Sequence, residues 1–89
     1  MSKYYTSQFV WKKIDENRAV RYFCFFDLSS KKYAVQNAEF FYLPINSQRL
    51  LEADVNGIEL FIDTSPLERC NWFDELLEAV ADHDLVFSL

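Results

Sequence analysis

The sequence predicts one α+β domain, in which a curved, mainly antiparallel sheet of four or five strands is covered by a C-terminal amphipathic helix. Three observations support this: period-two hydrophobic runs in the first half, a capped helical pattern in the last third, and a length of 89 residues, enough for one core. The composition, with 51% hydrophobic residues, one Gly and two Pro, is that of a folded chain. Residues 1–89 are therefore expected to form a single domain.

The first half predicts a three-stranded antiparallel meander. Residues 7–14 are rich in aromatic and β-branched side chains and are followed by a turn-forming cluster. Residues 19–27 are apolar on both faces, which is expected of a central strand whose second face is also covered. Residues 32–43 form the third strand, which Pro44 ends. The alternation changes phase around Asn37, and a β-bulge there would explain the slip.

Residues 47–63 admit two interpretations, because Asn56-Gly57 can be a hairpin turn or the C-terminal cap of a short helix. Residues 48–53 are good helix formers and Ser47 can serve as N-cap, which favours the helix. In both interpretations residues 58–62 form a strand.

The last helix has the most complete start signal in the chain. Ser65 is placed as N-cap, Pro66 as the first helical residue and Glu68 as a capping-box glutamate. We expect the helix to run to about His83 and the tail, residues 84–89, to form an edge strand or an apolar strap. The face expected to close over the sheet consists of Cys70, Trp72, Phe73, Leu76, Leu77 and Val80.

Charge is distributed unevenly along the chain. Residues 1–62 carry eight basic and seven acidic side chains, whereas residues 63–89 carry one basic and seven acidic side chains. The net charge of -5 disfavours nucleic-acid binding. The sequence also lacks a signal peptide and an apolar run long enough to span a bilayer, so the expectation is a cytoplasmic protein with no membrane partner.

The carboxylates of the last helix predict a docking face for a basic protein partner, as in an inhibitor or immunity-type protein. Asp74, Glu78 and Asp82 follow one another at helical spacing without an intervening cation. The predicted partner-binding residues are Glu68, Asp74, Glu75, Glu78 and Asp82.

The alternative function is small-ligand binding in an aromatic-lined cavity between sheet and helix. Arg69 lies in the apolar arc of the predicted helix and needs a carboxylate, an exit to water or an anionic ligand. The predicted ligand-binding residues are Trp11, Tyr33, Tyr42, Arg69 and Trp72. Nine Phe, five Tyr and two Trp exceed what one helix on a small sheet buries, so we also expect a homodimer.

The sequence contains no recognisable catalytic or metal-binding motif. Cys70 and His83 are thirteen residues apart, or about 20 Å along one continuous helix, so a Cys-His pair is not expected. A single His and two Cys residues without CxxC spacing predict no metal site. Because Gly57 is the only glycine, a glycine-rich phosphate loop is excluded. We predict no enzyme activity, no catalytic residue and no cofactor.

The C-terminal part of the chain resembles the ends of small uncharacterised bacterial proteins, including those carried on mobile gene cassettes of the integron type. The resemblance covers about a quarter of the chain. Its motifs are Leu67-Glu68-Arg69-Cys70-Asn71-Trp72-Phe73, Glu78-Ala79-Val80 and His83-Asp84. It implies a bacterial cytoplasmic accessory protein and carries no activity or catalytic residue to this chain.

Overall fold

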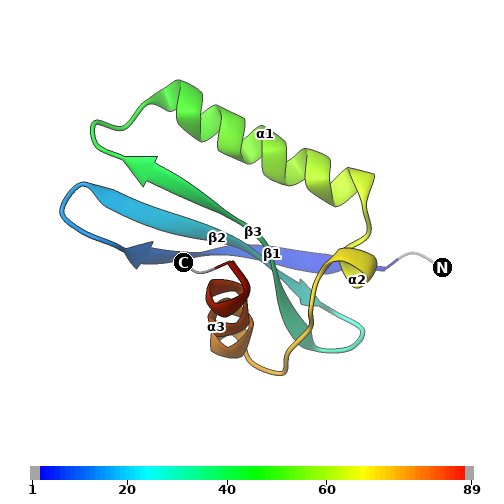
Figure 1. The fold of residues 1–89 in the computed structure, drawn as a ribbon. Helices are drawn as coiled ribbons and strands as arrows, with labels where there is room; N and C mark the ends of the chain where they lie inside the picture. Colours follow the sequence, from blue (N-terminus) through cyan, green and yellow to red (C-terminus); the bar gives the residue numbers. More distant parts are fainter. Residues whose placement is uncertain (1–2, 88–89) are drawn as a thin grey trace.

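A three-stranded antiparallel sheet with helices on both faces forms the structure, a computed structural model that describes residues 3–87. The strands are β1 (Tyr5–Lys13), β2 (Arg18–Asp27) and β3 (Lys32–Tyr42), with β2 in the centre. The helices are α1 (Ser47–Asp63), α2 (Pro66–Arg69) and α3 (Leu76–Phe87). Figure 1 shows α1 over one face of the sheet and α3 over the other. The α+β class and the meander are confirmed, but the described residues form three strands, not the four or five expected.

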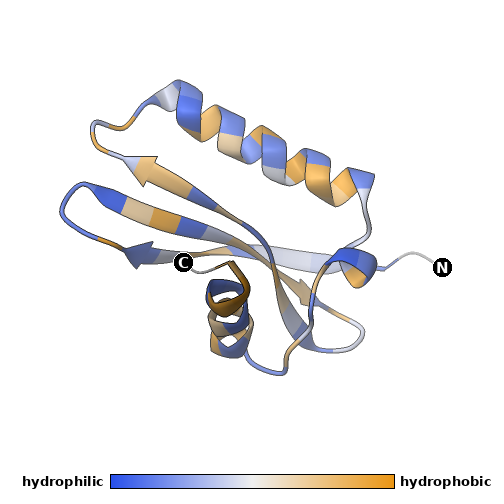
Figure 2. Cartoon of the chain, in the orientation of Figure 1, coloured by the Kyte–Doolittle hydropathy of each residue, from blue (hydrophilic) through white to orange (hydrophobic). Residues whose placement is uncertain are grey.

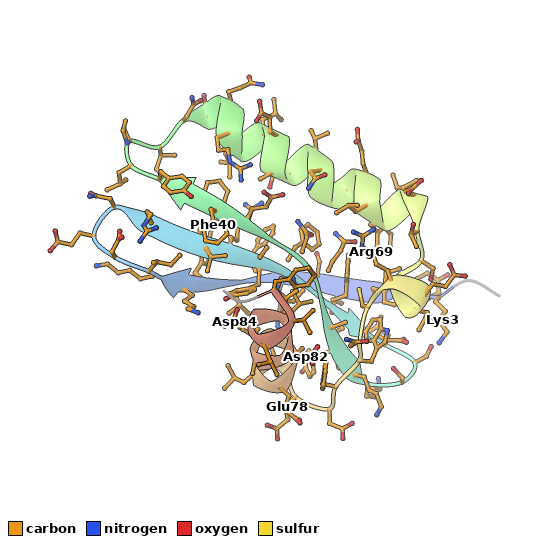
Figure 3. The ribbon with its side chains drawn as sticks, in the orientation of Figure 1. Lys3, Phe40, Arg69, Glu78, Asp82 and Asp84 are labelled. Atoms are coloured by element: carbon orange, nitrogen blue, oxygen red, sulfur yellow. The ribbon has the colours of Figure 1, made fainter. Side chains whose placement is uncertain are left out.

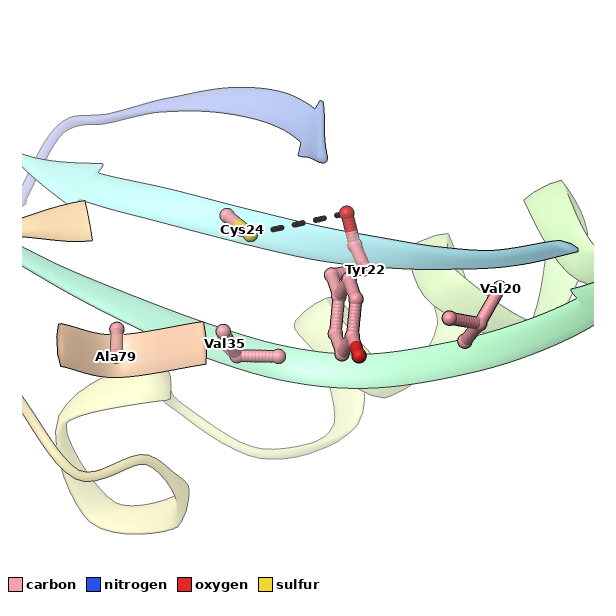
Figure 4. Packing of buried hydrophobic residues seen from close by; sticks show 5 residues of the cluster. All are labelled: Val20, Tyr22, Cys24, Val35 and Ala79. Carbon is pink, nitrogen blue, oxygen red and sulfur yellow. Dashed lines mark hydrogen bonds between the residues drawn. The ribbon is translucent and has the colours of Figure 1, made fainter. Parts of the chain in front are cut away.

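The central strand is buried on both faces, as its two-sided apolar pattern predicts. On the α3 face, Val20, Tyr22 and Cys24 pack with Val35 of β3 and Ala79 of α3 (Figure 4). Phe23 and Phe25 alternate with these residues and point toward α1. The second cover that the sequence requires is therefore α1.

A β-bulge interrupts β3 where the hydrophobic alternation changes phase. Phe23 pairs with Asn37 and Cys24 pairs with Val35, which leaves Gln36 as the extra residue of β3. The Gln36 side-chain amide donates a hydrogen bond of 3.0 Å to the Gly57 carbonyl. The predicted bulge is confirmed, and it also ties β3 to α1.

Helix α1 runs without interruption through Asn56-Gly57. Its N-cap is Asn46, whose side chain accepts a hydrogen bond from the Gln48 amide, and not the expected Ser47. A helix in this segment is confirmed, whereas its predicted end at Asn56-Gly57 and the strand expected at residues 58–62 are wrong. Gly57 serves close packing instead of a turn, since a Cβ added there would lie 2.8 Å from the Phe23 ring.

The single long helix expected from Ser65 to about His83 is wrong. Ser65 does cap a helix that begins at Pro66, but α2 ends at Arg69 and α3 begins at Leu76. Between the two helices, Phe73 forms an antiparallel bridge with Tyr33 through N–O hydrogen bonds of 2.7 and 2.8 Å. These hydrogen bonds satisfy the backbone N–H and C=O groups of Phe73, which would bond within the helix if the helix were continuous.

Helix α3 then continues to Phe87, where a strand or strap was expected. The remainder of that expected segment, residues 88–89, lies outside the described residues. The Tyr22 hydroxyl donates a hydrogen bond to Asp84, and Lys12 forms an ion pair of 3.2 Å with the same carboxylate. These bonds hold the C-terminal half of α3 on the sheet.

We predict that Gly57→Ala destabilises the protein. A helix interior normally gains about 1 kcal/mol from this change, but here the new methyl group would displace the Phe23 ring, and overpacking costs about 1–3 kcal/mol. Urea unfolding of Gly57→Ala should show a net loss, and the loss should be smaller in a Phe23→Leu background. A gain in stability for Gly57→Ala alone would contradict the packing described.

Candidate partner-binding surface

Helix α1 is held to the sheet by few buried side chains. Only Ala53 and Gly57 of this helix are buried. Beside them, the Arg21 guanidinium forms an ion pair of 2.8 Å with Asp54 and lies 4.0 Å from the centroid of the Phe9 ring. Arg21 is 4% exposed, so its charge depends on Asp54 and on the aromatic ring for compensation.

A second polar contact fixes the N-terminal half of α1. The Arg49 guanidinium bonds the Glu39 carboxylate at 2.8 Å and the Phe40 carbonyl at 3.1 Å. Asn56 donates a further hydrogen bond of 2.9 Å to Glu39. Because both ion pairs join α1 to the sheet, they determine which face of the helix points outward.

The outward face carries an apolar row that we call the outer seam: Leu51, Val55, Ile58 and Ile62. These side chains are 56%, 43%, 55% and 76% exposed, respectively. At 100° per residue they fall within an arc of roughly 60°, on the side of the helix opposite Ala53 and Gly57. Figure 2 shows hydrophobic residues at intervals along the whole length of α1. A helix that is apolar on two opposite sides can pack against the sheet with one side and against a binding partner with the other.

Carboxylates border the outer seam along one edge. Glu52, Glu59 and Asp63 are exposed, and none of them forms an ion pair with any residue in the range 3–87. Arg49 is the only basic residue of α1, and it is engaged with Glu39. The bordered seam is therefore apolar in the middle and negative on one side.

An apolar hollow of about 440 Å³ adjoins the N-terminal end of α1. Trp11, Phe41, Leu43, Ile45 and Leu50 line it together with residues of the β1–β2 turn. Trp11, Leu43 and Ile45 are 57–60% exposed. The hollow extends the apolar surface of this part of the molecule and can accept a bulky apolar side chain.

The five carboxylates predicted as a docking face are distributed over α2, α3 and the segment between them. Asp74 and Glu75 precede α3, so the predicted arrangement of Asp74, Glu78 and Asp82 on one helix is wrong. Asp74 forms an ion pair of 3.2 Å with Lys32, and Asp82 accepts a hydrogen bond from Asn71. Glu68 and Glu78 lie in the first turns of their helices, where negative charge is stabilising. Figure 3 shows Glu78 and Asp82 on α3, on the far side of the sheet from α1.

The structure does not bring the five predicted ligand-binding residues together. Strand register places Trp11 on the α1 face, and Tyr33 and Tyr42 on the α3 face. Trp72 stacks on Tyr5 at a centroid distance of 6.0 Å. The aromatic-lined cavity expected from these residues is therefore not formed by them.

Arg69 lies in a different hollow, of about 300 Å³, between β3 and α3. Cys70 and His83 line the same hollow. They were expected to lie far apart on one continuous helix, but the chain turns between α2 and α3 and brings them to the same hollow. Burial raises the pKa of Cys70 to about 11, and burial lowers the pKa of His83 despite Asp84 and Asp82. Burial therefore favours the protonated thiol of Cys70 and the uncharged imidazole of His83.

No group of three or more potential metal ligands is found among residues 3–87. Within the same range, no helix is long and apolar enough to cross a membrane. No protein-family model, curated protein or solved structure matches this chain. The resemblance to gene-cassette proteins stays a prediction.

The outer seam was not predicted from the sequence, although its signal is present. Leu51, Val55, Ile58 and Ile62 follow at intervals of four, three and four residues, which is a helical spacing. Because residues 58–62 were expected to form a strand, Ile58 and Ile62 were assigned to the sheet and the helical row was not recognised.

We predict that Asp54→Asn destabilises the protein by about 1–3 kcal/mol, because it leaves the buried Arg21 guanidinium without its anion. The double variant Arg21→Met/Asp54→Asn should lose less than the sum of the two single variants in urea unfolding. The control is Asp15→Asn, which breaks the exposed pair with Arg18 and should have a smaller effect. Additive losses would show that the pair does not orient α1.

Proposed function

We propose that this protein is a protein-interaction module that binds a basic protein partner through the outer seam of α1. The single observation that carries the proposal is the seam itself, whose four apolar side chains are 43–76% exposed. Burying such side chains against a partner is favourable by about 25 cal/mol per Å² of apolar area. Contiguous exposed apolar rows with a polar border are typical of protein-binding surfaces.

Electrostatics support a basic partner. The net charge of -5 and the unpaired carboxylates beside the seam create a negative field that speeds encounter with cations. The carboxylates of α3 add to this field from the opposite face of the sheet. Asp74 forms an ion pair with Lys32, and Glu68 and Glu78 lie in the first turns of their helices, so we assign the contact to α1.

The biological role that we propose is that of a small accessory protein, such as an inhibitor or immunity-type protein. The acidic charge and the C-terminal resemblance to proteins of mobile gene cassettes support this role. It requires a surface and no catalytic residue.

Photo-cross-linking tests the surface. With a photo-reactive phenylalanine analogue at Val55, irradiation in a lysate of the source cells should capture one protein rich in Lys and Arg, which mass spectrometry identifies. The same analogue at Leu77, an α3 residue that is 74% exposed, is the matched control and should capture nothing comparable. Leu51→Ser/Ile58→Ser should abolish capture and retain the wild-type circular dichroism spectrum. Equal capture from Leu77 would move the contact away from α1.

A second candidate function, small-ligand binding, is favoured by one observation. Arg69 lines the hollow beside α3 and forms no ion pair with any residue between 3 and 87. The volume of about 300 Å³ is at the lower end for ligand pockets. The ligand would be a small anion held by the guanidinium.

Thermal unfolding with inorganic phosphate or citrate tests this second function. Binding at the hollow should raise the midpoint of the wild-type protein by RT ln(1 + [L]/Kd) and leave Arg69→Gln unchanged. Lys31→Gln, which removes an exposed cation outside the hollow, is the control for non-specific anion effects. Equal shifts in all three proteins would exclude the hollow as the binding site.

A further inference from the structure

We infer that the occupant of the outer seam is an amphipathic helix of another protein, with an apolar row bordered by Lys or Arg residues, and not a second copy of this chain. This inference rests on the proposed function and specifies its partner. It follows from the spacing of the seam, from the charges along its two edges and from the pairing that two-fold symmetry would impose.

The spacing of the seam fits a helix. Intervals of four, three and four residues from Leu51 to Ile62 reproduce alternating a and d positions of a heptad. The row spans about 17 Å of helix at 1.5 Å per residue, close to two heptads. A straight, narrow apolar row of this kind accepts the apolar row of a second helix lying nearly along it.

The two edges of the seam differ in charge. Glu52 and Glu59 stand seven residues apart along one edge, so they recur at the same heptad position, and Asp63 follows one turn later. The other edge is formed by Leu50 and Phe61, which are 39% and 37% exposed, and by Asp54, which Arg21 neutralises. A partner helix therefore needs cations along only one border of its apolar row.

Helix α1 of a second copy does not supply those cations. In an antiparallel two-fold pair the acidic edges lie side by side, which brings Glu52 near Glu59 of the second copy. In a parallel two-fold pair the acidic edge meets the edge that carries Asp54. Arg49, the only basic residue of α1, is bound to Glu39 on the sheet side in every copy. Charge therefore favours a basic helix over self-association.

Two synthetic helical peptides of about 21 residues, or three heptads, test the inference. Both carry the same Leu/Ile row, one bordered by Lys and the other by Glu. In fluorescence anisotropy the Lys peptide should bind the wild-type protein at least about tenfold more tightly than the Glu peptide, and Glu52→Lys/Glu59→Lys should reverse that preference. Leu51→Ser/Ile58→Ser should abolish binding of both peptides.

The matched control changes the same net charge elsewhere. Glu75→Lys/Glu78→Lys alters two exposed carboxylates near α3 and should leave the preference for the Lys peptide unchanged. If this control also reversed the preference, the attraction would come from net charge alone and the inference would be overturned. Light scattering of the wild-type protein is the second measurement. A dimer that dissociates in Leu51→Ser/Ile58→Ser would identify a second copy as the occupant and would also overturn it.

The two proposals fail separately. Capture of a partner from Val55 together with no binding of the Lys peptide would leave the protein-interaction function standing and reject the basic helix. Absence of capture from Val55, with no binding of either peptide, would reject both. Capture of a basic protein whose cross-linked segment is helical would support both.

Discussion

Burial of β2 on both faces is the constraint on which the rest of the structure depends. Tyr22 and Cys24 on one face and Phe25 on the other are almost completely buried, so each face needs its own cover. A short chain meets this demand by placing α1 on one face and α3 on the other. No further layer among the described residues shields the helices, and their outer sides stay exposed. The exposure of the outer side of α1 is thus a consequence of a central strand with two buried faces.

The two helix layers are attached by different chemistry. The α3 layer encloses an apolar cluster and the hydrogen bond from the Tyr22 hydroxyl to Asp84, where burial, together with Asp84, raises the pKa of the tyrosine. The α1 layer buries Phe25, Phe41 and Ala53 and is also joined to the sheet by the ion pairs of Arg21 and Arg49. Directional polar bonds set the rotation of α1 about its axis more strictly than apolar contacts would. That rotation decides which side chains face outward.

Local signals in the sequence were sufficient to predict the three strands of the meander, the bulge near Asn37 and the start of α2 at Ser65-Pro66. Two features that involve contacts between distant residues were not predicted. The Asn56-Gly57 pair continues a helix because the Phe23 ring occupies the space beside the glycine. The helical period after Arg69 breaks because Phe73 finds backbone partners on Tyr33. The acidic charge of the chain was evident from the sequence, whereas the exposed apolar row on α1 was recognised only with the whole helix in view.

The extra residue of β3 belongs to both layers at once. Gln36 donates a hydrogen bond to the Gly57 carbonyl of α1, and it also lines the hollow beside Arg69 and His83 under α3. A three-stranded sheet would otherwise insulate its two faces from each other. The bulge therefore provides a single side chain, that of Gln36, which contacts α1 on one face of the sheet and the hollow under α3 on the other.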